Sequence, residues 1–131
     1  MEKGLGFRSE NYSPLVLAYM GDAYIELLTR EHIIGSGDCL PSSLNTRAKD
    51  FVTAASQSTA VDKLLPCLDE EELAFYKRGR NAKSNHSPRS ASAAEYRKST
   101  GLECLFGYLY LSERLERAAE LFRIGFLHIN N

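Results

Sequence analysis

Two carboxylates stand on apolar, helix-like stretches of the chain, and each has a glycine close by. Asp22 follows Gly21 in the run LVLAYMGDAYIELL, and Glu103 lies four residues before Gly107 in the run STGLECLFG. A carboxylate on an apolar helix needs a cation, a hydrogen-bond donor or water as its partner. Such a pair suits Mg²⁺, which takes one or two protein carboxylates and leaves its other positions to water and phosphate oxygens. Taken singly, each acid also fits a simpler place on a solvated helix surface.

Positive charge is concentrated in residues 77–98. This segment has a net charge of +6, whereas the rest of the chain has a net charge of −7. Guanidinium groups match phosphate geometry, and amide and hydroxyl groups can donate to phosphate or sugar oxygens. No aromatic residue lies between Arg78 and Arg89, so a duplex backbone fits better than the stacked bases of a single strand. The predicted RNA contacts are Arg78, Arg80, Asn81, Lys83, Ser84, Arg97 and Lys98. The alternative is a solvated loop that balances the acids at 69–72.

The elements that would position these groups are helices. A serine–proline start at 13–14 and capping boxes at 69–72 and 92–95 mark three helix starts. Since no segment shows convincing strand alternation, the sequence predicts an all-α fold with five to seven helices. The first helix is apolar on all sides and is expected to be the central one, and residues 44–55 are expected to carry an inward apolar stripe. Helices are predicted over residues 14–32, 43–65 (as one or two), 69–79, 93–111 and from 112 onward, with a polar basic loop over 79–91.

Length and composition predict a single domain over residues 1–131, with residues 1–12 flexible. The 44% of hydrophobic and 25% of charged residues exclude a disordered chain. The longest apolar stretches, Leu15–Met20 and Cys104–Leu111, are too short for a membrane span, and the N-terminus lacks the apolar core of a secretory signal. Three cysteines match no zinc or disulfide pattern, so they are predicted to be reduced thiols of a cytoplasmic protein.

Three segments together resemble the ribonuclease III family. The run LAYMGDA at 17–23 resembles the family signature with a Gly-Asp pair on a central helix, and STGLECLFG at 99–107 resembles the second motif. The RGRNAKS stretch at 78–84 is the most specific part and is similar to the Mini-ribonuclease III branch, which consists of the catalytic domain alone. The segment 41–52 also has a counterpart there. The resemblance covers about Ser13 to Leu121.

The resemblance implies a ribonuclease III-type endonuclease domain without a double-stranded-RNA-binding domain. It implies a homodimer that holds duplex RNA in a valley between protomers, each cutting one strand. Asp22 and Glu103 would be the catalytic residues and the ligands of Mg²⁺, for which Mn²⁺ could substitute. The expected task is trimming the ends of the large-subunit (23S) ribosomal RNA precursor during ribosome biogenesis, with a ribosomal protein as a further partner. The wider family has two more acids, whose positions hold Ala18 and Thr100 here, as in the Mini branch.

Two other functions are compatible with the same residues. The fold also occurs in catalytically silent RNA-binding or ribosome-associated proteins, and the absence of two acids permits that interpretation. Retention of both Asp22 and Glu103 argues against it. A helical dimerisation module with an incidental basic loop is the third alternative, and it predicts no RNA affinity.

Overall fold

The computed structural model describes residues 8–35, 37–83 and 92–127. In these ranges the chain forms six α-helices and two short 3₁₀ helices and no strand, which confirms the expected all-α fold. In chain order the elements are η1 (Ser9–Asn11), α1 (Pro14–Ile34), α2 (Pro41–Val52), α3 (Ala54–Leu64), η2 (Leu65–Cys67), α4 (Glu70–Arg80), α5 (Ala93–Leu111) and α6 (Leu115–Phe126).

Local sequence accounts for the helix starts. The Ser13 side chain accepts a hydrogen bond from the Val16 amide at 3.3 Å, with proline at the first position of α1. The capping boxes predicted at 69–72 and 92–95 are both present, at the starts of α4 and α5. The predicted 43–65 region forms two helices, because Thr53 has an extended backbone with ψ of 153° and its side chain caps α3.

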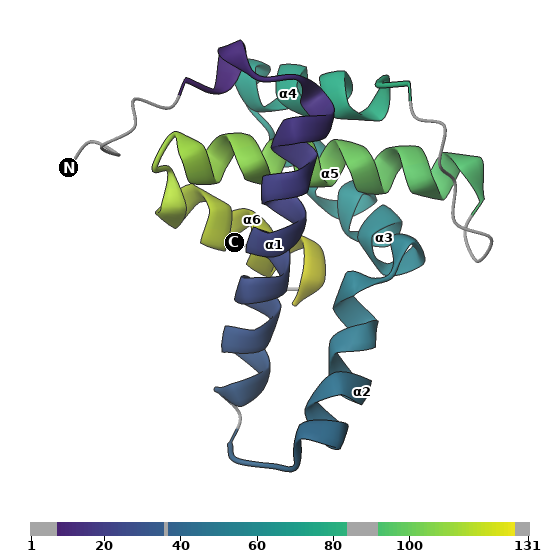
Figure 1. Ribbon diagram of the computed structural model, residues 1–131, viewed down its shortest axis with the longest axis vertical. Helices are drawn as coiled ribbons and strands as arrows, with labels where there is room; N and C mark the ends of the chain where they lie inside the picture. The colour runs from purple at the N-terminus through teal and green to yellow at the C-terminus, as the bar shows by residue number, and fades with distance from the viewer. Residues whose placement is uncertain (1–7, 36, 84–91, 128–131) are drawn as a thin grey trace.

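The helix with neighbours on most sides is α5 rather than α1. In Figure 1, α5 lies between α4 above it and α3 and α6 below it, and α1 crosses it. Four of its large side chains are fully buried: Leu102, Leu105, Phe106 and Leu109. The expectation that the first helix is central is therefore corrected. α1 buries one side only and exposes apolar side chains on the other, namely Leu15, Val16, Tyr19, Leu27 and Ile34.

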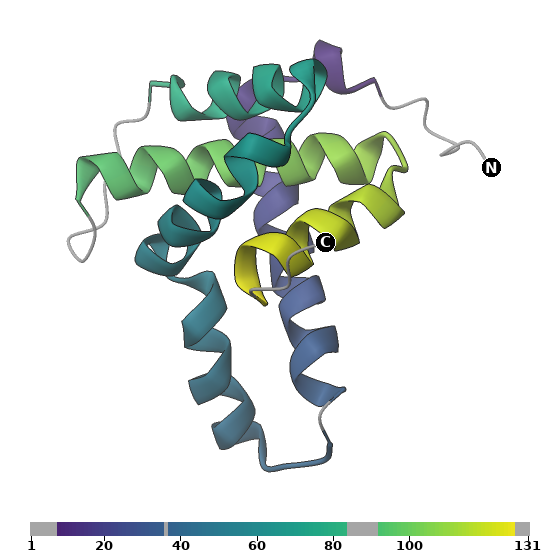
Figure 2. The same cartoon turned by 180° about the vertical axis from the view of Figure 1, so that it is seen from behind.

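The lower half of α1 and α2 project together from the rest of the molecule (Figures 1 and 2). α2 has no buried residue, so the inward stripe predicted for residues 44–55 is only partly covered, although its member Phe51 packs against the core. Phe51 is its main anchor, because its ring stacks on Phe122 and Phe126 of α6 at centroid distances of 6.1 and 6.0 Å. α2 is thus attached mainly through its C-terminal turn.

Glycine allows α4 to pack closely against α5. A Cβ atom built on Gly79 would lie 2.5 Å from Cys104 Cβ and 2.7 Å from the Thr100 carbonyl oxygen. Gly79 therefore lies inside α4, which continues to Arg80, and the helix end predicted at residue 79 is wrong. The glycine is needed for tertiary contact rather than for helix termination.

The turn between α5 and α6 takes three residues, so the last helix begins at Leu115 and not at the predicted Ser112. Ser112 ends α5, and Glu113 has a φ of 59°, in the left-handed region. The Arg114 amide then donates to the Leu109 carbonyl at 2.9 Å. This is the hydrogen bond of a Schellman motif, with glutamate at the position that usually holds glycine.

Part of the segment expected to be flexible packs against the body. Ser9 in η1 is buried, and its Oγ lies 3.2 Å from Ser112 Oγ. Residues 1–7 of that segment lie outside the described ranges. Cys39, Cys67 and Cys104 are all free thiols. Within the described ranges, no helix is both long enough and apolar enough to cross a bilayer.

Candidate active site

Figure 1 shows that α1 crosses α5. The two acids singled out in the sequence meet at this crossing, where Glu103 forms a hydrogen bond with Asp22. A Cβ atom built on Gly21 would lie 1.6 Å from the Glu103 carbonyl oxygen, and one built on Gly107 would lie 1.9 Å from the Leu17 carbonyl oxygen. Only glycine can occupy both positions, because any side chain would overlap the opposite backbone. The two glycines therefore bring the turn of α1 that carries Asp22 onto the turn of α5 that carries Glu103.

The environments of the two carboxyl groups differ. Asp22 is exposed, whereas Glu103 is half-buried. Burial raises the pKa of Glu103 to about 8, and the Asp22 charge and a hydrogen bond with Asp22 act in the same direction. A carboxylate this close favours the protonated form of Glu103 when no cation is near. A divalent cation favours the ionised form of Glu103 and replaces its proton.

The donor set fits a hard divalent cation with few protein ligands. Within the described ranges, no group of three or more His, Cys, Asp or Glu side chains is placed to hold a metal. Ala18 is apolar and buried, and the Thr100 hydroxyl donates to the Tyr96 carbonyl at 3.0 Å. Neither position adds a charge. Asp22 and Glu103 would therefore be the charged protein ligands, and water and phosphate oxygens would complete the shell, as Mg²⁺ prefers.

The raised pKa of Glu103 predicts how the stability of the metal-free protein depends on pH. The folded state keeps this proton up to about pH 8, whereas the unfolded chain releases it near the ordinary value of 4.5. The group's contribution to stability is therefore fully present below pH 4.5 and is lost as the pH rises towards 8. In EDTA, Glu103→Gln should be more stable than the wild type at pH 8, with no such advantage at pH 4.5. Urea unfolding at both pH values measures this, and an advantage of the same size at both would contradict it.

Two of the predicted RNA-binding cations, Arg78 and Lys98, make contacts that join α4 and α5 to other parts of the protein. Arg78 donates to the Tyr12 carbonyl at 3.0 Å, and its guanidinium lies 5.2 Å from the Phe75 ring centroid. Lys98 forms an ion pair with Asp62 of α3 at 2.7 Å. Both cations therefore contribute to holding the N-terminal segment and α3 in place.

The other predicted RNA contacts gather at one end of the molecule. α4 runs antiparallel to α5, so Arg80, Asn81 and Lys83 at the end of α4 lie near the start of α5, where Arg97 is found. Arg80 Nε donates to Asn81 Oδ1 at 3.1 Å, while Lys83 and Arg97 are exposed. Arg78 and Arg80 belong to α4 and not to a loop. Ser84 lies outside the described residues.

A buried polar contact near the acids was not predicted from the sequence. The Ser99 hydroxyl of α5 donates to the Gln57 side-chain oxygen of α3 at 2.5 Å, and both side chains are buried. Ser99 lies one helical turn before Glu103. Gln57 stands in the mixed run AASQSTA, which gives no sign that this polar side chain is buried.

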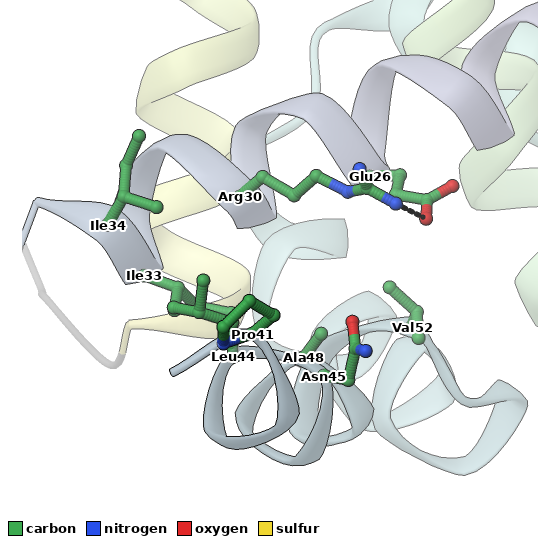
Figure 3. Close-up of a pocket in the computed structure, with 9 residues that line it drawn as sticks. All are labelled: Glu26, Arg30, Ile33, Ile34, Pro41, Leu44, Asn45, Ala48 and Val52. Atoms are coloured by element: carbon green, nitrogen blue, oxygen red, sulfur yellow. Dashed lines mark hydrogen bonds and ion pairs between the residues drawn. The ribbon is translucent and has the colours of Figure 1, made fainter. Parts of the chain in front are cut away.

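An apolar groove lies between the second half of α1 and α2, and Figure 3 shows the residues that line it. Its volume is about 430 Å³, and the ion pair of Arg30 with Glu26, 2.8 Å long, lies at its edge. Glu26 is one turn from Asp22, so the groove continues the exposed side of α1 that carries the acid. The apolar lining, made by Ile33, Ile34, Pro41, Leu44, Ala48 and Val52, suits protein contact better than catalysis.

Comparison with known proteins agrees with this geometry. The family model of the ribonuclease III domain matches residues 15–114. The chain is 45% identical to the Mini-ribonuclease 3 of Brevibacillus brevis, over 87% of this chain and 85% of that protein, and 44% identical to that of Symbiobacterium thermophilum, over 82% and 83%. A crystal structure of a Fusobacterium nucleatum protein, 37% identical, aligns with a TM-score of 0.78 and covers 87% of this chain and 91% of that one. The chain therefore belongs to the ribonuclease III family of endoribonucleases, in its Mini-ribonuclease III branch.

Proposed function

We propose that the protein is a Mg²⁺-dependent endoribonuclease that cuts double-stranded RNA, with Asp22 and Glu103 as its catalytic residues. The observation that carries this proposal is the acid pair at the α1–α5 crossing, where Gly21 and Gly107 let two backbones touch. A bound divalent cation would supply Lewis-acid chemistry, activating water for in-line attack on phosphorus and stabilising the leaving oxygen. Mn²⁺ would substitute, because it also suits carboxylate and water ligands.

The protein groups have separate tasks in this scheme. The exposed Asp22 carboxylate is accessible to a phosphate, and the half-buried Glu103 is held by the packing of α5. Arg97 lies six residues before Glu103 on the same helix, which is about 9 Å along the axis. Together with Arg80 and Lys83, it would bind phosphates that flank the reacting one. Asn81 and Ser84 would add neutral hydrogen bonds to the RNA. Arg78 and Lys98 would raise the positive electrostatic potential where the RNA binds.

Removing three exposed or half-buried cations should weaken RNA binding in a salt-dependent way. In an Asp22→Asn background, the triple change of Arg80, Lys83 and Arg97 to alanine should flatten the log–log salt slope for duplex RNA by about two to three units. Filter binding across a salt series measures the slope. The matched control is Arg123→Ala, which removes an exposed cation of α6 and should leave the slope unchanged. An identical slope for the triple variant would show that these side chains do not contact RNA.

The exposed side of α1 supports a homodimer. Val16, Tyr19, Ala23 and Leu27 recur every three or four residues and so share one face, and Tyr19 is 82% exposed. The apolar groove extends this face towards the end of α1. A second copy packed here would place two acid pairs on one surface, as cutting both strands of a duplex requires.

We expect sedimentation at micromolar concentration to give a species of twice the 14.7 kDa chain mass. Tyr19→Glu would place a charge in the centre of the interface and should shift the protein to monomer. Glu116→Gln, an exposed change on α6, should leave the dimer intact. A wild-type protein that sediments only as a monomer would contradict this arrangement.

The natural duplex is proposed to be the paired ends of the large-subunit (23S) ribosomal RNA precursor, cut in the cytoplasm. The resemblance to Mini-ribonuclease III supports this choice. A ribosomal protein bound to the same precursor would be the further partner. Precursor RNA should be trimmed by the purified protein at paired ends and not within its single-stranded regions.

The alternative is a catalytically silent RNA-binding protein, which the presence of Ala18 and Thr100 at two acid positions of the wider family permits. One assay separates the two functions. A long RNA duplex and its separate strands are incubated with the protein in Mg²⁺ or in EDTA. Cutting of the duplex in Mg²⁺ alone supports the nuclease. Binding without cutting supports the silent protein, and absence of both supports a dimerisation module.

A further inference from the structure

We propose that Gln57 is a positioning residue, whose hydrogen bond with Ser99 fixes the turn of α5 that carries Glu103 and so directs this carboxylate towards Asp22. The inference rests on the function proposed above. Gln57 contacts Ser99 of α5, the helix that carries Glu103, and it acts on the acid through this helix.

The contact is polar, and both of its side chains are buried. Gln57 is 1% exposed and Ser99 is 8% exposed, and they join helices that lie 42 residues apart in the chain. Burying an amide is costly unless it is hydrogen-bonded, and an apolar side chain would fill the same place without that cost. The polar pair favours one relative orientation of α3 and α5. A hydrogen bond weakens steeply when its geometry changes, whereas apolar packing is non-directional.

The hydrogen bond lies close enough to Glu103 along α5 to affect the orientation of its carboxylate. Ser99, Glu103 and Gly107 follow one another at intervals of four residues and share one side of the helix. Glu103 therefore lies one turn, about 6 Å along the axis, from the hydrogen bond to α3. Its own backbone carbonyl faces Gly21 of α1, and Gly107 faces Leu17. These backbone contacts fix the distance between α1 and α5, but they include no side chain that resists rotation of α5 about its axis. The Gln57–Ser99 bond resists that rotation.

A second polar link between described residues of α3 and α5 is more tolerant of movement. Lys98 and Asp62 form an ion pair at 2.7 Å, with the Asp62 side chain 61% exposed. Exposed ion pairs contribute little and tolerate movement of both partners. The buried bond therefore adds a directional restraint on α5 to the packing of its buried apolar side chains.

The test is Gln57→Met, which keeps the length of the side chain and removes the acceptor. Binding of Mn²⁺ to the RNA-free protein should weaken about tenfold, as for other supports of metal ligands. The kcat for duplex cleavage should fall by a similar factor, and KM for RNA should stay within twofold. Thr29→Val is the matched control, because it removes a buried hydroxyl bond, 2.8 Å to the Ile25 carbonyl, that lies within α1. It should lower stability without changing Mn²⁺ binding.

A second pair of variants separates positioning from packing. Ser99→Ala should reproduce the loss of Mn²⁺ binding, and Ser99→Thr, which keeps a hydroxyl donor, should restore it. The double variant Gln57→Met/Ser99→Ala should be no worse than either single variant, since both remove one bond. If Gln57→Met does not fold, the comparison of Ser99→Ala with Ser99→Thr decides.

Two failures are distinguishable. Folded Gln57→Met and Ser99→Ala proteins whose Mn²⁺ affinity and kcat lie within twofold of the wild type would overturn the positioning role alone. A wild-type protein that neither binds Mn²⁺ nor cuts duplex RNA would contradict the proposed function, and the positioning role would fall with it.

Discussion

Asp22→Asn should lower the rate of duplex RNA cleavage by about a thousandfold while leaving the fold intact. The amide keeps the shape of the side chain but removes the charge that a hard cation requires. Electrostatic stabilisation by such a cation contributes several kcal/mol to the transition state, and about 4 kcal/mol corresponds to a factor of one thousand. Asp22 is exposed, so the substitution disturbs no packing. Single-turnover cleavage measures the rate, and thermal melting checks the fold.

The matched control for this change is Asp50→Asn, which alters an exposed aspartate on α2. It should cut duplex RNA at the wild-type rate. The Asp22→Asn protein should still bind duplex RNA, because the cations at the end of α4 are untouched. Cleavage by a folded Asp22→Asn protein at the rate of the control would remove Asp22 from the catalytic site.

Gly21→Ala should destabilise the fold by on the order of 4 kcal/mol, a large part of the stability of a domain of this size. The new methyl carbon would lie 1.6 Å from the carbonyl oxygen of Glu103 and 2.7 Å from the Gly107 amide nitrogen. Both are backbone atoms, so relief requires α1 and α5 to separate. That separation opens the core and moves the two acids apart. Urea unfolding and Mn²⁺ binding report the two effects.

Gly125→Ala is the control, because Gly125 also lies where two helices meet. Its Cβ would be 3.1 Å from Ala60 Cβ and 3.1 Å from Leu64 Cδ2, so the contacts are tight but do not overlap, and the Leu64 side chain can move. The cost should be about 1 kcal/mol, as for mild overpacking. If Gly21→Ala were no less stable than Gly125→Ala, the close contact of α1 with α5 would not be what holds the acids together.

Features set by neighbouring residues could be predicted from the sequence. The capping boxes at 69–72 and 92–95 and the start of α1 at Pro14 are where local chemistry places them, and α5 has its predicted limits. Features set by other helices could not. Glycine is typical of a helix end, but Gly79 lies within α4 and allows close contact with α5. The left-handed position after α5 holds Glu113, where glycine is usual.

Each acid of the site has a glycine close by on an apolar helix, and the structure brings the two acids together at that glycine contact. Residue type and the nearby glycines already predict that the two acids share a cation, and the family resemblance supports the pairing. Their approach itself depends on how α1 and α5 cross, which no local pattern contains. The burial of Gln57 also depends on how helices distant in the chain pack together. Its helix is short and mixed in composition, and only the position of α5 against it makes the side chain internal.

The most direct test of the shared metal site is a Mn²⁺ titration of ¹⁵N-labelled protein followed by NMR. Mn²⁺ broadens the signals of nearby amides, so its place in the molecule can be located without any assay of activity. Broadening should centre on two segments far apart in the chain, 20–23 of α1 and 102–107 of α5, and excess Mg²⁺ should reverse it. Broadening centred on the exposed acids at 69–71, or on one of the two helices alone, would contradict a cation held jointly by Asp22 and Glu103.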